Sequence, residues 1–454
     1  MTNKRIRIAA TSAVMFSVIS ACGGVGGGTD TAGGGGVAGA EGPITTQGLS
    51  LPDEIAKVRV DAARQATGVD VRINEGAFDP QQFLSSVAAD SPPDVVYMDR
   101  ELIGSYAARG ALMPLTDCVA KAGVDMAQYR EPAVNEVTLD GVVYALPDFY
   151  NLRVLITSDK AATEAGVSPE VSTADWATLG DTAKKLGRSS GQTPSRIGFD
   201  PKIPEYLPMW AHANGGALVS ADGKRTQLDS PQVVEALEYT TGLIGEQGGW
   251  GSFKAFRDSF DMFGERNPFV ADQLGSFPME QWYINTLAST TPDVAVTVTP
   301  FLDRQGKPFT WATGNALAIP KGAKHPGSAC TFIKTMTEAK TWVSAAKARA
   351  EAVRGKGNTY TYTGTYTGNH VADKEIFAEV YKPTGNKVFD DAVRTLLTVQ
   401  DNAFTQPTTA AGQQVRDAWR GAVNRVLGGE QKPAEALAQA QREAQTALDE
   451  ANRR

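Results

Sequence analysis

The stretch VDVRINEGAFDPQQFLSSVAADSPPDVVYMD, residues 69–99, contains two strand-like runs separated by a helix-like run. Its two ends, VDVRIN (69–74) and DVVYM (94–98), are rich in the β-branched residues that strands favour. Between them, Pro80 opens a helical segment, and Pro92-Pro93 closes it. A strand, a helix and a strand in this order predict a β-α-β unit, which belongs to a largely parallel sheet with helices on both faces.

The same alternation continues on both sides of this stretch. Upstream, Asp53 can cap a helix that runs to about Ala66 and that Gly68 ends. Downstream of residue 373, strand-like runs vanish and helical periodicity takes over, with Pro433 opening the last helix. Further strands are predicted at 142–146, 153–157, 196–199, 274–277, 294–298 and 316–320, and helices around 175–187, 231–246 and 326–353.

Three segments rich in aromatic and amide residues are predicted to cross between two lobes. They are LPDFYNL (146–152), FTWATGN (309–315) and VRGKGNTYTYTGTYTGNH (353–370). In two-lobed α/β proteins, ligands bind at strand carboxyl ends and between the lobes. We therefore expect these crossovers to line a ligand crevice.

The first residues indicate export. Residues 1–21 combine a basic head with an apolar run that is too short to span a bilayer, which is typical of a signal peptide. The stretch VISACGG (18–24) resembles a bacterial lipobox, so Cys22 is predicted to become the first mature residue and to carry lipid. An ordinary signal peptide with an incidental cysteine is the alternative. The Gly-rich residues 22–42 predict a flexible tether, and folding is expected to start near Pro43.

Charge and length limit the possible partners. The formal net charge is −7, and residues 1–21 carry three positive and no negative charges, so the charge without them is −10. An acidic chain without Lys/Arg clusters is a poor nucleic-acid binder. The remaining chain of about 430 residues is long enough for two lobes with substantial cores. The chain after residue 21 has no apolar run of about 20 residues, so no membrane-spanning segment is predicted there.

A series of short stretches in one order, spread over nearly all of the mature chain, carries a family resemblance. The stretches are PPDVVYMD (92–99), YAARGALMPLTD (106–117), DGVVYALPDFYNLRVLITSDKAATEAGV (140–167), TADWATLGDTAKKL (173–186), WAHANGGALVS (210–220), FVADQLGSFPMEQW (269–282), WATGNALAIPKGAKHPGSACTFIKTM (311–336), YTGNHVADKEIF (366–377) and KPAEALAQAQREAQTALDEA (432–451). Together they resemble the extracellular solute-binding proteins of carbohydrate ABC transporters, the family that includes the maltodextrin-binding proteins.

The resemblance implies an α/β, two-lobed periplasmic-binding-protein-like fold with three inter-lobe crossovers and a helical C-terminal tail. Lobe I would comprise 43–150 plus 313–354, and lobe II 151–312 plus 355–454. The implied protein is a monomer without a cofactor or catalytic activity, tethered to the outer face of the cell membrane, or to the periplasmic side where there are two membranes. It would capture a sugar by hinge closure and deliver it to a membrane permease whose ATPase is a separate chain.

Two segments depart from the family pattern. Many relatives have a Tyr-Asn pair where this chain has Ile156-Thr157-Ser158-Asp159, and a Gly-x-Leu-Pro turn where it has TYTGTYTGNH (361–370). Both segments lie near the crevice in relatives.

A sugar presents apolar faces and a rim of hydroxyls, so its site needs flat aromatic rings and fixed polar groups. The resemblance places Trp210, Trp282 and Trp311 by the crevice, with core packing as the alternative for each, and Trp250 is a weaker candidate. Carboxylates and amides that follow strands or lie on crossovers supply the rim, although Asp99 can equally be a helix cap. The expected ligand-binding residues are Asn74, Glu75, Asp99, Arg100, Asp148, Tyr150, Asn151, Trp210, Asn214, Glu280, Trp282, Trp311, Thr313, Asn315, Tyr366 and Asn369.

Other chemistries have weaker signals. Cys118 and Cys330 can form one disulfide or remain two buried thiols. The three histidines stand far apart, without an H-E-x-x-H or C-x-x-C motif, so no metal site is expected. The motif G-x-x-x-x-G-K-[ST] does not occur, which argues against an ATPase.

Several readings stay open beside the sugar receptor. They are a binding protein for a peptide, a polyamine or another small polar solute, a lipid-anchored carbohydrate-active enzyme, a tethered sensor or adhesin, and a ferric-iron site built from Tyr360, Tyr362 and Tyr366.

Overall fold

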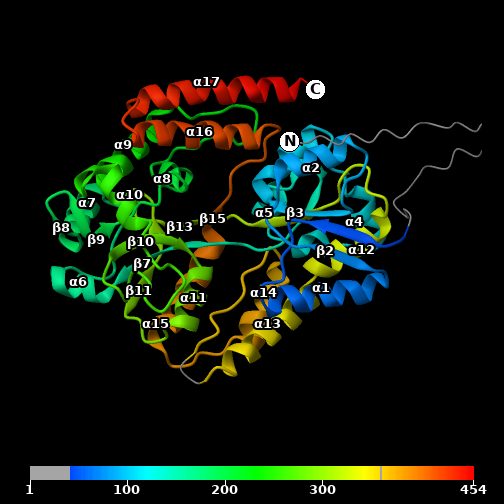
Figure 1. The fold of residues 1–454 in the computed structure, drawn as a ribbon, viewed down its shortest axis with the longest axis horizontal. Coiled ribbons are helices and arrows are strands. Elements are labelled where there is room, and N and C mark those ends of the chain that lie inside the picture. The colour runs from blue at the N-terminus through cyan, green and yellow to red at the C-terminus, as the bar shows by residue number, and fades with distance from the viewer. Residues whose placement is uncertain (1–40, 358–359, 454) are drawn as a thin grey trace, which may run out of the picture. The chain divides into compact units, whose positions relative to one another are not determined.

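The computed structural model describes residues 41–357 and 360–453 (Figure 1). The predicted signal peptide, Cys22 and all but the last two residues of the tether lie outside the described residues. The described chain has two five-stranded sheets. We call the part built on the sheet that contains β1 the first lobe, and the part built on the sheet that contains β7 the second lobe.

The sheet of the first lobe has the strand order β2-β1-β3-β14-β6. β1 is parallel to β2 and β3, whereas β14 is antiparallel to both β3 and β6. The quoted β-α-β unit forms as expected, but β1 inserts between its two strands. The strand bounds are β1 Ile44–Gln47, β2 Val71–Asn74, β3 Val95–Asp99, β6 Ala145–Pro147 and β14 Asn315–Ala318.

The sheet of the second lobe has the order β11-β7-β10-β9-β8. Only β9 and β10 are parallel; the other three pairings are antiparallel. The expectation of a largely parallel fold is therefore wrong for this lobe, because β7 and β8 pair against the direction of their neighbours. The bounds are β7 Arg153–Ser158, β8 Arg188–Ser190, β9 Thr193–Phe199, β10 Leu274–Glu280 and β11 Val296–Thr299.

Five short strands make two small sheets. β12, β13 and β15 form one, and β4 and β5 form the other. β15 follows residue 373, where no strand is expected, and it pairs in parallel with β13. The bounds are β4 Thr138–Leu139, β5 Val142–Val143, β12 Phe301–Leu302, β13 Pro308–Trp311 and β15 Ala403–Phe404.

Helices cover both faces of the first sheet. Alternate residues of β3 point to opposite faces, since Val95 packs with the core beneath α1 and α12 and Val96 packs with the core that contains Phe83 of α2. Asp53 caps α1 by accepting a hydrogen bond from Ala56, as predicted. The bounds are α1 Glu54–Thr67, α2 Pro80–Ala88, α3 Ile103–Ala108, α4 Thr116–Ala122, α5 Glu131–Asn135, α12 Pro326–Thr337, α13 Ala339–Arg354 and α14 His370–Glu375.

One helix is expected over 326–353, but the structure has two. Glu338 has an extended backbone and separates α12 from α13. Helix α14 and the following π-helical turn Ile376–Val380 pack against α13. The assignment of residues 313–354 and 355–454 to different lobes stays a prediction.

The second lobe has one large core, which the helices given next cover together with the two C-terminal helices. The bounds are α6 Asp159–Ala165, α7 Trp176–Leu186, α8 Leu207–Ala213, α9 Pro231–Glu246, α10 Gly249–Arg257, α11 Trp282–Thr290 and α15 Lys387–Val399. The last two helices, α16 Gly412–Leu427 and α17 Pro433–Asn452, lie side by side (Figure 1). The beginning of α16 contacts α3, whereas the rest of α16 and α17 contact α9.

The three crossovers meet through backbone hydrogen bonds. Asn151 exchanges two with Thr313, at 2.8 and 3.0 Å. The Tyr150 amide donates to the Tyr366 carbonyl at 3.2 Å, and Phe149 and Thr367 form an isolated antiparallel β-bridge. Segments far apart in the sequence thus lie side by side where β6 ends and β7 begins.

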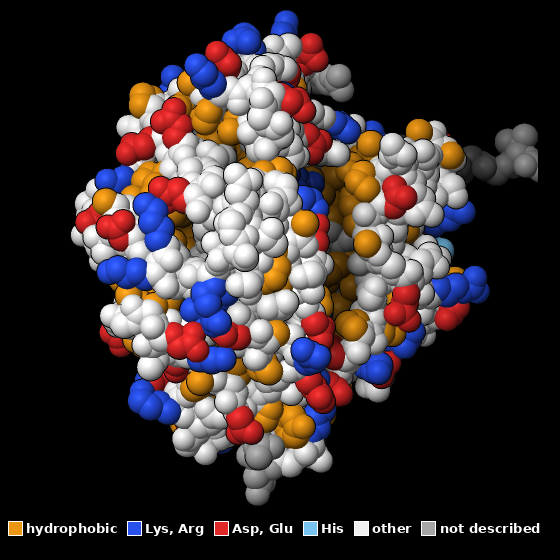
Figure 2. All heavy atoms as spheres, turned by 60° about the vertical axis from the view of Figure 1, so that its left-hand side comes forward, with side chains coloured by type: hydrophobic (Ala, Val, Ile, Leu, Met, Phe, Trp, Pro, Cys, Tyr) orange, Lys and Arg blue, Asp and Glu red, His pale blue; other side chains and the backbone are white. Residues whose placement is uncertain are grey.

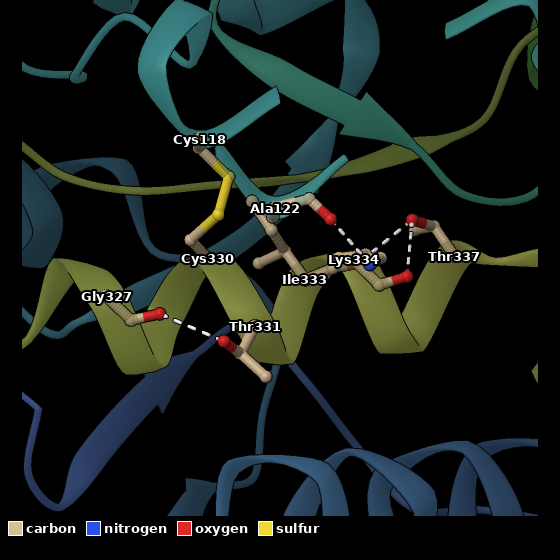
Figure 3. The surroundings of a disulfide bond; sticks show 8 residues. All are labelled: Cys118, Ala122, Gly327, Cys330, Thr331, Ile333, Lys334 and Thr337. Carbon is tan, nitrogen blue, oxygen red and sulfur yellow. Dashed lines mark hydrogen bonds between the residues drawn. A yellow bond between two sulfur atoms is a disulfide. The ribbon is translucent and has the colours of Figure 1, made fainter. Parts of the chain in front are cut away.

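A disulfide joins Cys118 of α4 to Cys330 of α12 (Figure 3). The same helices are held by a hydrogen bond of 2.6 Å from the Lys334 ammonium to the Ala122 carbonyl. Of the two readings of the cysteine pair, the structure therefore has the bonded one.

Candidate functional site

A cavity of about 380 Å³ opens beside the joined crossovers. Ends of β3 and β14 in the first lobe and of β7, β10 and α11 in the second supply its walls. Figure 2 shows a hollowed face of the molecule with hydrophobic, acidic and basic side chains along the hollow. We call this cavity the charged chamber, since Glu101, Glu205, Arg153, Lys202 and Arg420 line it.

Seven of the expected ligand-binding residues line the charged chamber together. They are Asp99, Asn151, Glu280, Trp282, Trp311, Thr313 and Asn315. They meet because β14 pairs with β3, β10 pairs with β7, and the first two crossovers join these strands. Two tryptophan rings and a set of amide and carboxylate groups therefore border one space.

Arg153, the first residue of β7, organises one wall of the chamber. Its guanidinium donates to the Glu280 carboxylate at 3.0 Å, to the Trp311 carbonyl at 2.8 Å and to the Thr313 hydroxyl at 3.2 Å. The guanidinium carbon lies 4.1 Å from the Trp311 ring centre and 4.8 Å from that of Tyr206. An arginine held by several partners fixes the positions of the groups around it.

Four buried polar atoms on chamber-lining residues have no hydrogen-bond partner among the described residues. They are Arg153 Nε, the Tyr206 hydroxyl, Trp311 Nε1 and Arg420 Nε. Desolvation and the nearby Glu280 carboxylate raise the pKa of Tyr206, which keeps its hydroxyl protonated. Because buried polar groups in proteins are generally paired, these donors indicate a place that a polar ligand would satisfy.

Asp99 lies at the opposite wall, where β3 ends. It accepts hydrogen bonds from the Asn315 amide at 3.2 Å and from Arg416 of α16 at 3.3 Å. Arg416 also donates to Glu101 at 2.8 Å. Desolvation and the Glu101 carboxylate raise the pKa of Asp99, although Arg416 opposes them. Asp99 makes no side-chain cap hydrogen bond to the helical turn that follows it, so its capping role is not realised.

Glu136 is the buried acid of the chamber. Its carboxylate accepts from Arg100 Nε at 2.7 Å, and both side chains are almost fully buried. Desolvation raises the pKa of Glu136 to about 7, and Arg100 limits the rise. Arg100 also donates to the Phe149 carbonyl, so it supports the first crossover from below.

Three of the expected residues on and near the first crossover lie outside the charged chamber. Arg100, Asp148 and Tyr150 are all buried beneath the crossovers and line no wall of the charged chamber. Asp148 forms an ion pair with Arg59 of α1, and the guanidinium carbons of Arg100 and Arg130 lie 5.5 and 5.3 Å from the centre of the Tyr150 ring. These charged and aromatic residues fix the crossover from inside, since a buried charge requires a partner.

Trp210 lies in the core, which was the alternative to a position by the crevice. Its ring is fully buried, packs edge-on to Phe301 at 5.0 Å, and donates to the Pro201 carbonyl at 2.9 Å. The hydrogen bond of its indole is thereby satisfied within the second lobe. Trp250 packs against the same core and lines neither the charged chamber nor the cavity beside it.

The remaining expected residues are separated. Asn369 is buried and caps α14, and Asn214 bonds to Gln232 and Glu235 at the end of α8. Asn74 and Glu75 are exposed at the end of β2, in a different cavity of about 590 Å³. Tyr366 lines an adjoining cavity of about 360 Å³. Asn151 and Trp282 line both this cavity and the charged chamber.

Several lining residues were not expected from the sequence. A sequence signal for Arg153 existed, because it is a charged residue at the beginning of an otherwise apolar strand next to a crossover. Lys202 and Tyr206 lie in a loop that has no regular pattern, and Lys202 adopts a positive φ of 56°. Arg420 lies beside the core residue Trp419 on a helix of the tail, and only the packing of α16 brings it to the chamber.

The chain matches a known protein family over residues 59–352, which is more than half of its length. The matching family is described as bacterial extracellular solute-binding protein. The chain belongs to this family. The sequence resemblance is thus confirmed, and membership places this solute-binding protein outside the cytoplasm. The description of the family is that of a binding protein.

Solved structures confirm the two-lobed fold. CpMnBP1 with mannotriose bound has a TM-score of 0.72 and 24% identity, covering 88% of this chain and 99% of its own. An ABC substrate-binding protein from Listeria monocytogenes in complex with cycloalternan has a TM-score of 0.70 and 18% identity, covering 90% and 100%. A maltose/maltodextrin-binding domain from Bdellovibrio bacteriovorus bound to maltotriose has a TM-score of 0.64 and 17% identity, covering 91% and 100%.

Two features are absent from the part of the chain that the structure describes. Among residues 41–357 and 360–453, no group of three or more His, Cys, Asp or Glu side chains could hold a metal ion. Within the same part of the chain, every helix is too short or too polar to cross a membrane.

Proposed function

We propose that this protein is the substrate-binding lipoprotein of an ABC importer and that it captures a sugar or oligosaccharide in the charged chamber. The observation that carries the proposal is the convergence of Trp282 and Trp311 with Asn151, Glu280 and Asn315 around one cavity. Aromatic rings can cover the apolar faces of a sugar, and amides and carboxylates can bind its hydroxyls. The three relatives named above support the proposal, since each was solved with a saccharide.

The chamber can supply enough affinity. A carboxylate can accept from two neighbouring hydroxyls, and charged hydrogen bonds are stronger than neutral ones. Glu280, which Arg153 holds in place, and Asp99, which Asn315 and Arg416 hold, are such acceptors on opposite walls. Micromolar binding requires only about −8 kcal/mol, which a few such bonds with one or two stacked rings can provide.

Hinge closure follows from the distribution of these groups. Asp99 and Asn315 belong to the first lobe, whereas Glu280 and Trp282 belong to the second. A ligand that contacts both walls stabilises the closed arrangement by the contacts that an open arrangement lacks. The membrane permease would recognise the closed form. Small-angle scattering should show a smaller radius of gyration with saturating ligand, and an unchanged profile would contradict closure.

The proposed anchor is Cys22, with residues 22–42 as the tether. Two or more acyl chains on one cysteine hold a protein stably, because each buried methylene contributes about 0.8 kcal/mol. The protein would then remain at the outer face of the cell membrane, or on the periplasmic side in a two-membrane cell, as a monomer. Cys22→Ser should move it from the membrane fraction to the soluble fraction; retention in the membrane would contradict lipidation.

A small cationic solute such as a polyamine is the second candidate. The favouring observation is the carboxylates of Asp99, Glu101, Glu205 and Glu280 on the chamber walls. A thermal-shift screen with saccharides, polyamines and peptides separates the two candidates, because a ligand at 100 times its Kd adds about 2.7 kcal/mol of stability. Shifts with saccharides alone support the sugar receptor, and shifts with amines or peptides alone refute it.

A further inference from the structure

The segment TYTGTYTGNH (361–370), which departs from the family pattern, builds a second cavity next to the charged chamber. The cavity has a volume of about 360 Å³ and shares Asn151 and Trp282 with the charged chamber. We call it the tyrosine chamber. One wall comes from Tyr362, Gly364, Thr365 and Tyr366, and another from Asn285, Thr286 and Ser289 of α11.

Hydrogen bonds hold the wall of the tyrosine chamber in one conformation. The Tyr362 hydroxyl bonds to the Thr365 hydroxyl at 2.8 Å, and the Asn285 amide donates to the Gly364 carbonyl at 3.3 Å. Gly364 has a φ of +94°, and a Cβ there would lie 2.4 Å from the Phe377 ring. Only glycine fits such a position, so the segment is fixed against both α11 and Phe377.

The two chambers differ in chemistry. Most residues that line the tyrosine chamber carry a hydroxyl or an amide group, although carbon atoms supply more of its surface than polar atoms do. Its two charged lining residues are engaged elsewhere, since Asp53 caps α1 and Arg349 pairs with Glu54 at 2.9 Å. Hydroxyl groups both donate and accept, which matches the hydroxyls of an uncharged sugar residue.

We propose that the tyrosine chamber is a second ligand compartment, which holds one end of a saccharide at least two residues long. The other end lies in the charged chamber, and the chain passes Asn151 and Trp282, the residues common to both. Each chamber lies within the range of about 300–1,000 Å³ that ligand cavities occupy. This inference rests on the proposed function and adds a minimum length to its ligand.

The test fills the tyrosine chamber and leaves the charged chamber open. Ser289→Phe places a ring in the chamber from α11, and Thr286→Phe is a second filling variant from the same helix. Thr290→Phe is the matched control, because Thr290 adjoins Ser289 on α11 and lines neither cavity. Isothermal titration calorimetry measures the affinities for two series, mannose, mannobiose and mannotriose, and glucose, maltose and maltotriose, and thermal unfolding verifies that each variant is folded.

We expect the wild-type affinity to rise with chain length in one of the two series. The filling variant that stays folded should weaken trisaccharide binding at least 10-fold and change monosaccharide binding less than twofold, and Thr290→Phe should change neither. A wild type that binds monosaccharide as tightly as trisaccharide overturns the second compartment, and so does a filling variant that weakens both equally. If no saccharide binds the wild type, the proposed function itself fails, and the inference fails with it.

Discussion

Replacing Arg153 by methionine tests whether the wall of the charged chamber depends on one buried arginine. Arg153 is 6% exposed, and its removal leaves the Glu280 carboxylate, at 18% exposure, without an ion-pair partner. The Trp311 carbonyl and the Thr313 hydroxyl also lose their donor. Removing one partner of a buried ion pair costs about 3–5 kcal/mol, and we expect the free energy of unfolding to fall by about 4 kcal/mol.

The matched control is Arg188→Met in the same lobe. Arg188 is 47% exposed and pairs with Glu164 at 3.0 Å and with Asp272, so its loss should cost about 0–1 kcal/mol. Urea unfolding followed by tryptophan fluorescence measures both variants. Equal losses for Arg153→Met and Arg188→Met would refute the reasoning, because the energetic difference is attributed entirely to burial. We also expect Arg153→Met to abolish ligand binding, since Glu280 is no longer held.

Three further results are expected. Cys118→Ser with Cys330→Ser should lower stability by at most about 5 kcal/mol, because the bond closes a loop across a sequence separation of 212, and an unchanged urea midpoint would contradict this. Burial raises the pKa of Glu136 from 4.5 to about 7, so the wild type loses stability as the pH rises from 4.5 through 7. Glu136→Gln resembles the protonated carboxyl and does not titrate, so the wild type should become less stable relative to Glu136→Gln between pH 5 and pH 8, and a constant difference would be inconsistent with the raised pKa. Gly104→Ala should lower the free energy of unfolding by about 1–3 kcal/mol, because a Cβ there would lie 2.4 Å from the Thr409 carbonyl oxygen. An unchanged free energy of unfolding would mean that the backbone at Thr409 moves away without cost.

Local sequence patterns predicted where many of the strands and helices lie, but they did not predict whether neighbouring strands pair in parallel or antiparallel. Strong β-branched runs located β3, β7 and β11, and Asp53 and Gly68 marked the ends of α1. Strand direction depends on partners distant in the sequence, and no local pattern shows that β7 pairs against β10. β1 was missed because ITTQ is only four residues long and has one strongly apolar side chain.

The residues of the candidate site also divide into those that the sequence could locate and those that it could not. Polar and aromatic residues on crossovers, such as Asn151 and Thr313, were located from the sequence because the crossovers themselves are recognisable. Asp148 and Tyr150 have the same residue types but face inward, toward arginines from α1 and other segments. The facing of a side chain on an irregular segment is set by tertiary packing, and for the same reason Arg420 of the C-terminal tail could not be anticipated.

The most direct measurement is a crystal structure of the protein with the saccharide that gives the largest thermal shift. We expect saccharide density in the charged chamber in contact with Trp282, Asn151 and Glu280, with both lobes touching the ligand. Density confined to the outer surface, or a ligand that touches one lobe only, would contradict the proposal that this protein captures a sugar between its lobes.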